Sequence, residues 1–230
     1  MLRKSLGFLL ALCLLCAVAG VGASAAALED EARVLLARTL ATLKSDTYTL
    51  ITTGGYKVFD KGITIADKDR YMLEYELDSS RKVEQWILGS HRRDIYLPGK
   101  SYHVYPDRGF YYRHDQDYEG TIFPTILPSF LTQNLERADM NAISAELVTR
   151  NGKRYVAAYV PTSDTHTMAF HYLDGQLKQI DIIDARGTQP FVTISEFTPT
   201  IDVKVFEPKG IRVPEKFFYF IKDRMLPLFP

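Results

Sequence analysis

The chain has 230 residues, of which 24% are charged and 46% are hydrophobic, and its 28 Lys and Arg balance its 28 Asp and Glu. This composition is typical of a globular protein and excludes a disordered chain or one that binds nucleic acid through strong positive charge. The length fits a single domain. The only cysteines, Cys13 and Cys16, lie near the start, so the rest of the chain holds no disulfide framework and no cysteine zinc site.

Residues 1–27 form a targeting segment. Arg3 and Lys4 precede an apolar run, and small residues at 23–25 or 25–27 match the pattern that signal peptidase recognises. We therefore expect an exported protein whose mature chain begins at Ala26 or Leu28. Two alternatives use the cysteines. Cys13 and Cys16 have the spacing of a redox motif, and either could be acylated, although leucine precedes each.

The next segment, residues 28–44, is predicted to be an amphipathic helix. Its apolar residues recur at spacings of three and four, which places them on one stripe. Acidic residues at 29–31 and Lys44 at the other end complement the helix dipole. The stripe consists of Leu28, Ala32, Leu35, Leu36, Leu40 and Leu43.

After this helix the apolar period changes to two, which indicates β-strands. Residues 71–77 alternate most clearly, with Tyr71, Leu73 and Tyr75 on one face and Glu74 on the other. Further strands are expected within residues 83–88, 102–105, 155–160, 168–173, 177–183 and 191–197. Turn sequences separate them at 98–99, 106–109, 151–152, 174–175 and 186–187. Short strands joined by tight turns predict an all-β antiparallel meander.

An apolar segment at residues 121–137 interrupts this pattern. Pro124 and Pro128 are expected to break it into one or two short helical turns packed across the sheet. Two interpretations remain open, a core-filling plug and a mobile lid over a cavity. Its apolar cluster consists of Phe123, Ile126, Leu127, Phe130 and Leu131.

No motif for catalysis or for metal or cofactor binding is present. The sequence lacks GxSxG, HExxH, a phosphate loop and GxGxxG, and its five histidines do not have the spacing of a metal site on one strand face. Ser90 and His91 are neighbours on an expected strand, so their side chains point apart. We therefore expect no enzyme activity, no cofactor and no bound metal.

Four short stretches resemble the periplasmic outer-membrane lipoprotein carrier family, the LolA-like proteins. They occur in the family's order over about residues 28–215. They are residues 65–75 (IADKDRYMLEY), 99–106 (GKSYHVYP), 173–180 (LDGQLKQI) and 205–213 (VFEPKGIRV). Asp67 stands where the family has the arginine that ties down the lid of the carriers, and Lys68 stands where it has a proline. Leu73 stands where the family has a second inward aromatic residue.

This resemblance implies an antiparallel half-barrel at residues 28–213, with the N-terminal helix and the short helical insert on its concave face. That face would hold the acyl chains of a lipoprotein or another lipid, because burying acyl chains needs only an apolar surface. The expected ligand-binding residues are Tyr71, Leu73, Tyr75, Phe123, Ile126, Leu127, Phe130 and Leu131.

Residues 214–230 form an apolar tail beyond the resemblance. Nine of these seventeen residues are large and apolar, so the tail is expected to pack on the sheet, to cover the cavity, or to contact a membrane or a receptor.

The resulting functional hypothesis is a monomeric periplasmic carrier or chaperone for lipoproteins or other lipids, with membrane-bound donor and acceptor proteins as partners and no nucleic acid. The alternative is an envelope sensor that uses the same fold to bind a lipid or protein signal.

Overall fold

The computed structural model describes residues 25–54, 59–77, 81–115 and 126–225. Phe123 and Pro124 of the insert, and both cysteines, lie outside these residues. An N-terminal helix covers residues 25–44. It is followed by β1 (Thr47–Gly54), β2 (Phe59–Asp67), β3 (Arg70–Leu77), α2 (Lys82–Leu88), β4 (His91–Leu97), β5 (Lys100–Tyr105) and β6 (Phe110–His114). The second half contains α3 (Ile126–Arg137), β7 (Ser144–Arg150), β8 (Lys153–Ser163), β9 (His166–Leu173), β10 (Gln176–Asp184), β11 (Gly187–Thr198), β12 (Ile211–Arg212) and α4 (Glu215–Phe220).

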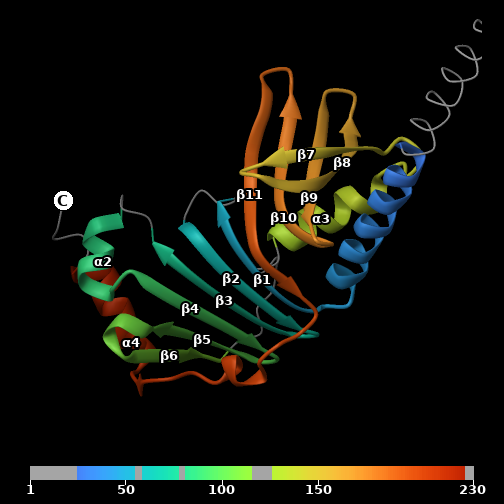
Figure 1. Cartoon of the computed structure of the whole chain (residues 1–230). Helices are drawn as coiled ribbons and strands as arrows, with labels where there is room; N and C mark the ends of the chain where they lie inside the picture. The colour runs from blue at the N-terminus through green and yellow to red at the C-terminus, as the bar shows by residue number, and fades with distance from the viewer. Residues whose placement is uncertain (1–24, 55–58, 78–80, 116–125, 226–230) are drawn as a thin grey trace, which may run out of the picture.

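The described strands form one open sheet in the order β12-β6-β5-β4-β3-β2-β1-β11-β10-β9-β8-β7. Strands β1–β6 and β7–β11 make two wings that join where β1 pairs with β11 (Figure 1). The prediction of an all-β protein is confirmed, and the open sheet is consistent with a half-barrel. The expectation of a purely antiparallel sheet is wrong at one edge, where the short β12 runs parallel to β6.

The predicted hairpins are confirmed. Tight turns join β4 to β5, β7 to β8, β9 to β10 and β10 to β11 at the expected positions. Asn151 and Asp174 have positive φ angles of 50° and 51°, and the glycine after each has φ near 74°. Asn, Asp and Gly tolerate this left-handed backbone best, which explains why their pairs mark the turns.

The segment expected to be a strand at residues 83–88 is instead the helix α2. Glu84, Gln85 and Leu88 all have good helix propensity, and only Leu88 is buried, so the apolar run does not line a strand face. Gly89 ends the helix with φ 84° and donates its N–H to the carbonyl of Gln85. The side chain of Gln85 donates to the carbonyl of Leu77 and holds α2 against the end of β3.

The insert also differs from the expectation of kinked turns. Residues Ile126–Arg137 form one twelve-residue helix, α3. Pro128 lies in its first turn, where a backbone N–H has no partner inside the helix, so proline does not break it.

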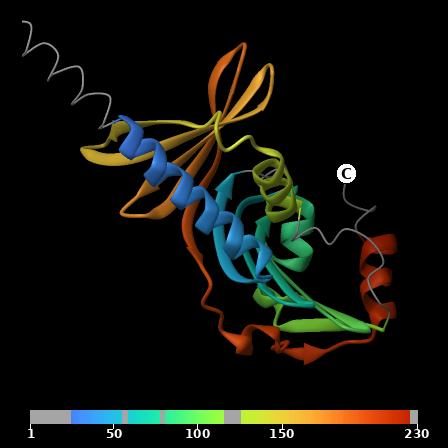
Figure 2. The same ribbon diagram turned by 90° about the vertical axis from the view of Figure 1, so that its right-hand side faces the viewer.

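The N-terminal helix, α2, α3 and α4 all pack on the same face of the sheet, which we call the helix face. The N-terminal helix and α3 cover it over the β7–β11 wing and the adjoining β1 (Figure 2), where they bury Leu36, Leu131 and Phe170 in one core cluster. At the other end, α2 and α4 pack on Tyr105 and Tyr112 of β5 and β6. The predicted stripe of the N-terminal helix is confirmed as its buried side, except that Leu28 and Leu40 are only partly buried.

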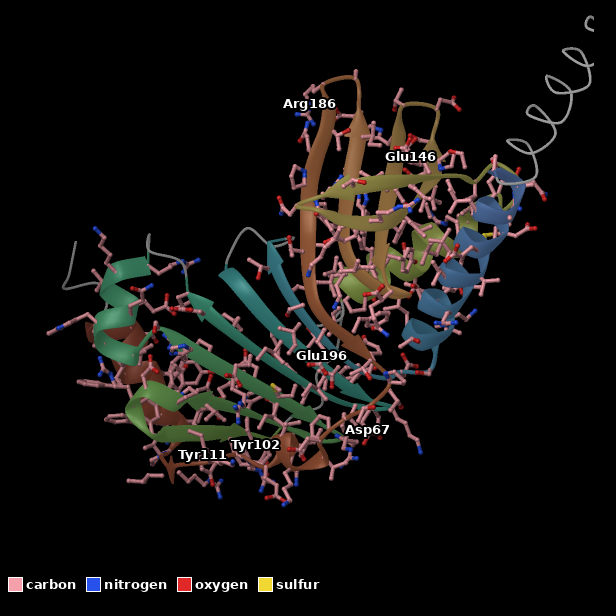
Figure 3. The ribbon with its side chains drawn as sticks, in the orientation of Figure 1. Asp67, Tyr102, Tyr111, Glu146, Arg186 and Glu196 are labelled. Carbon is pink, nitrogen blue, oxygen red and sulfur yellow. The ribbon has the colours of Figure 1, made fainter. Side chains whose placement is uncertain are left out.

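The opposite face has its own cover, the segment after β11. Ile201, Val205 and Phe206 pack there on a second cluster that includes Met72 and Ile95. Tyr102 and Tyr111 flank this cluster, with their ring centroids 5.9 Å apart, on the side of the sheet away from the helices (Figure 3). Glu74 also lies on this face, where it accepts a hydrogen bond of 2.8 Å from Nε of Arg93, so the predicted sidedness of β3 is confirmed.

Candidate ligand-binding site

Cross-strand register places three predicted residues in the middle of the helix face. Directly paired residues of neighbouring strands share a face. Tyr71 pairs with Ala66 and Tyr96, Leu73 with Thr64 and Asp94, and Tyr75 with Gly62 and Arg92. The three predicted residues therefore lie between the helices at one end of the face and those at the other.

A cavity of about 450 Å³ opens beside Tyr71, between the end of the N-terminal helix and α3. This volume is in the range of sites for small organic ligands. Its lining residues are Leu43, Lys44, Asp46, Tyr48, Tyr71, Pro128, Ser129, Thr132, Gln133 and Glu136.

The cavity has one apolar wall, and the rest of its lining is mostly polar or charged. Leu43 and Tyr48 are 4% and 2% exposed and belong to the core cluster, and Tyr71 packs against that cluster. Lys44 and Glu136 form an ion pair of 2.7 Å that joins the N-terminal helix to α3. Burial, followed by the nearby charge of Asp46, raises the pKa of Tyr71, so its hydroxyl stays neutral. This combination suits an amphiphile, with its apolar part inside and its polar part at the rim.

The structure brings only some of the predicted residues together. Leu127 and Leu131 are 2% exposed and join the core cluster with Tyr71. Leu73 is buried at 1% exposure. Phe130 is 39% exposed and makes an edge contact with Phe191, with ring centroids 5.7 Å apart, at the border of that core. Ile126 begins α3, but its side chain lies outside the described residues, as does Phe123.

Beyond Leu73 the helix face becomes polar. Nδ1 of His103 lies 2.8 Å from Oδ1 of Asp94, and a carboxylate can only accept, so Nδ1 carries the proton. Nε2 then faces the hydroxyl of Ser101 at 3.4 Å. The ring of Tyr112 stacks on His103 at 4.7 Å. Burial and then the charge of Asp94 raise the pKa of Tyr75 far above its usual range.

The order serine, histidine, aspartate is that of a hydrolase triad. Here, however, Ser101 is 5% exposed and its hydroxyl lies 3.4 Å from Nε2, at the outer limit for donating a hydrogen bond to that nitrogen. We therefore treat the three side chains as a hydrogen-bonded polar cluster on the helix face, which we call the polar wall.

Sequence reasoning missed this polar wall and the residues of α3 that line the cavity. The polar wall could have been predicted from the Pro98-Gly99 turn, because this turn sets the register that pairs Asp94 with His103 and Tyr96 with Ser101. Thr132 and Gln133 gave no such signal, because their position depends on how α3 packs against the N-terminal helix.

Arg92 anchors the buried end of this face. It is 4% exposed, and Nη1 donates to the carbonyls of Leu88 and Gly89 at 3.1 and 2.9 Å. Its guanidinium also lies 4.6 Å from the ring centroid of Tyr105. Arg92 therefore caps the C-terminus of α2 and ties it to the sheet.

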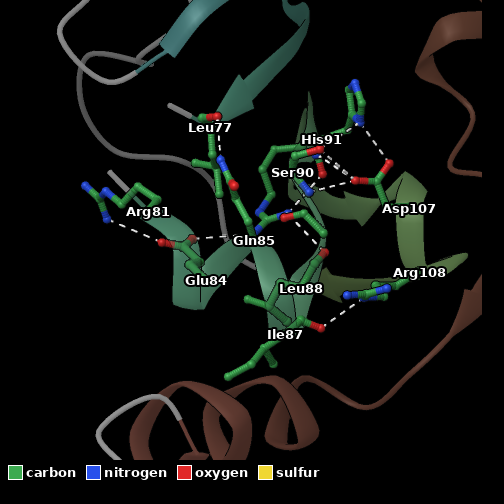
Figure 4. Close-up of polar contacts among 12 residues, drawn as sticks. Leu77, Arg81, Glu84, Gln85, Ile87, Leu88, Ser90, His91, Asp107 and Arg108 are labelled. Atoms are coloured by element: carbon green, nitrogen blue, oxygen red, sulfur yellow. Dashed lines mark hydrogen bonds and ion pairs between the residues drawn. The ribbon is translucent and has the colours of Figure 1, made fainter. Parts of the chain in front are cut away.

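Ser90 and His91 meet at a structural clip around Asp107 (Figure 4). Oδ2 of Asp107 accepts the backbone N–H groups of Ser90 and His91 at 2.7 and 3.1 Å, and Oδ1 lies 2.8 Å from Nδ1 of His91. Burial raises the pKa of Asp107, but the hydrogen bonds from His91 and Ser90 outweigh it and lower the pKa to about 2. A Cβ on Gly89 would come within 2.5 Å of Cβ of Asp107, so glycine is required there. The expectation that the side chains of Ser90 and His91 point apart is wrong, because Oγ of Ser90 lies 3.3 Å from Nδ1 of His91 and both contact the carboxylate of Asp107. Because the same carboxylate holds the backbone of both residues, we interpret the cluster as an anchor for the start of β4.

A second buried polar cluster lies on the opposite face of the β7–β11 wing. Oδ2 of Asp181 accepts from Nη2 of Arg150 at 3.0 Å and lies 2.9 Å from Nε2 of His171. Gln179 donates to its other oxygen at 2.5 Å. Burial, with the nearby charge of Arg150, lowers the pKa of His171, so the imidazole is neutral at pH 7.

In the described part of the chain, no group of three or more His, Cys, Asp or Glu side chains is arranged to hold a metal ion. None of the described helices is both long and apolar enough to span a membrane.

Comparison with known proteins gives no family assignment. No family model matches the chain, and no curated protein matches its sequence. The fold of the chain was also compared with solved structures, and two of those that match are the following. An uncharacterized conserved protein from Thermus thermophilus has a TM-score of 0.36 at 7% identity, over 78% of this chain and 97% of its own. PNGF-II has a TM-score of 0.27 at 11% identity, over 78% of this chain and 34% of its own.

Proposed function

We propose that the protein binds an amphiphile with a fatty-acyl chain, such as a lipid or the acylated end of a lipoprotein, in the cavity beside Tyr71. The observation that carries this proposal is the apolar wall that Leu43, Tyr48 and Tyr71 give this cavity, whose remaining lining is mostly polar and includes one ion pair. Each buried methylene contributes about 0.8 kcal/mol, so a chain of a few carbons suffices for measurable affinity.

The resemblance to the lipoprotein carriers supports the same class of ligand, and the open all-β sheet is consistent with the half-barrel it implies. On this basis we propose a monomeric carrier or chaperone that acts in the periplasm after export by a signal peptide. It would need no cofactor and catalyse no reaction, and its partners would be membrane-bound donors and acceptors.

One observation favours the alternative, a sensor that holds its ligand. Asp67 forms a local ion pair with Arg70 across the β2–β3 turn, where the resemblance places the carriers' lid-holding arginine. Lys68 in the same turn has φ 58°, a left-handed conformation that proline cannot adopt. The turn therefore lacks the arginine that ties down the lid of the carriers, which favours a protein that binds its ligand without handing it on.

Substituting Thr132→Trp is expected to weaken the binding of a fluorescent fatty-acyl probe at least about tenfold, or about 1.4 kcal/mol. The indole would occupy part of the 450 Å³ cavity, because Thr132 lines it from α3. Arg137→Trp is the matched control, since Arg137 is exposed in the last turn of the same helix and does not line the cavity. Titration of the probe into both variants measures the difference. Equal affinities of parent and both variants would place the probe elsewhere.

A further inference from the structure

The C-terminal helix α4 exposes three neighbouring aromatic side chains. Phe217, Tyr219 and Phe220 are 47%, 47% and 57% exposed. The other side of the helix packs on the sheet. Phe218 stacks on Tyr112 of β6 with ring centroids 4.7 Å apart, and Ile221 is buried in the same cluster. We call the three exposed side chains the α4 patch.

The α4 patch extends toward neighbouring elements. Ile211 of β12, four residues before α4, is 75% exposed. Trp86, 64% exposed, belongs to α2, which shares a core cluster with α4 through Leu88 and Ile221. Several large apolar side chains exposed on neighbouring elements are typical of an interaction surface.

The segment that contains the α4 patch has a net positive charge, although the whole chain is neutral. Residues 208–225 contain five basic residues and two acidic ones. One of the two, Glu215, is engaged by Nδ1 of His114 at 2.6 Å and by the hydroxyl of Tyr219 at 3.2 Å. The basic residues are Lys209, Arg212, Lys216, Lys222 and Arg224.

We propose that the α4 patch docks on the surface of an anionic lipid bilayer. Aromatic side chains settle at the level of the lipid headgroups, and each nearby Lys or Arg adds electrostatic attraction to an anionic surface. A second copy of this chain would bring a like-charged patch, so the charge favours the bilayer. This proposal does not rest on the proposed function, because α4 lies at the opposite end of the helix face from the cavity beside Tyr71 (Figure 1).

Co-sedimentation with vesicles tests the proposal. The purified protein is expected to bind vesicles of equimolar phosphatidylcholine and phosphatidylglycerol, to bind pure phosphatidylcholine far more weakly, and to dissociate as salt is raised. The double variant F217S/F220S and the double variant R212E/K216E should each bind the anionic vesicles at least about tenfold more weakly. Both pairs are exposed, so the fold should be retained.

Matched controls lie at the far edge of the sheet. Leu147 of β7 is 50% exposed, and Lys153 of β8 is exposed. L147S and K153E should bind the vesicles as the parent does, and F217S/F220S should bind the acyl probe as the parent does. Equal binding of the patch variants and the parent, or no preference for anionic vesicles, would overturn the proposal. So would sedimentation velocity showing a parent dimer that F217S/F220S dissociates, since the α4 patch would then be a self-association surface.

Discussion

Replacing Asp181 with alanine is expected to lower the free energy of unfolding by about 3 kcal/mol. Asp181 is 1% exposed and is the shared acceptor for Arg150, His171 and Gln179. Its loss would leave the guanidinium of Arg150 and the imidazole of His171 without their shared acceptor. A buried polar or charged group that has lost its partner destabilises the fold. We expect the low end of the known range because the side chain of Arg150 is 33% exposed and can recover some hydration.

Urea denaturation of the variant measures this effect, and Asp164→Ala provides the control. Asp164 lies exposed in the turn between β8 and β9, so its loss should change the free energy of unfolding by less than about 0.5 kcal/mol. Equal stability of the two variants would show that the Asp181 cluster contributes nothing to the fold.

Leu131→Ala is expected to lower the free energy of unfolding by about 3 kcal/mol. Leu131 is 2% exposed and packs, with Leu127 and Leu135, in the core cluster shared with the N-terminal helix. Its truncation would leave a void in that core, and the cost reflects both the lost burial and the void. This result would favour the plug interpretation of the insert, with the cavity formed along the flank of α3.

Phe130→Ala on the same helix is the comparison, because Phe130 is 39% exposed and contacts only the edge of the core through Phe191. We expect a loss below about 1 kcal/mol. A different outcome would favour the lid. If Leu131→Ala left global unfolding unchanged and only accelerated amide exchange within residues 126–137, α3 would open as a unit.

The elements predicted well from the sequence are those fixed by local pattern. The stripe of the N-terminal helix gives Leu36 and Leu43 as buried residues, and the Asn151-Gly152 and Asp174-Gly175 turns fix two hairpins. Alternation within β3 places Leu73 and Glu74 on opposite faces. In each case the information lies within a few residues along the chain.

The features that were missed depend on distant contacts. The run at 83–88 looks extended, yet Gln85 and Arg92 fix it as a helix through the carbonyls of Leu77 and Leu88. The parallel β12–β6 pair forms because the segment after β11 crosses the face of the sheet opposite the helices and reaches β6. The cavity beside Tyr71 needs α3 and the N-terminal helix together, and no local pattern reports how two helices pack.

The most direct test of the central claim is photo-cross-linking with a diazirine-bearing fatty acid, followed by mapping of the labelled peptides. Acyl binding in the cavity predicts saturable labelling of Tyr48 and Tyr71 and of α3 residues 128–133, all of which line it or lie between lining residues. An excess of unlabelled fatty acid should remove this labelling. Labelling confined to α4, or labelling that fatty acid does not displace, would contradict an acyl-binding cavity between the N-terminal helix and α3.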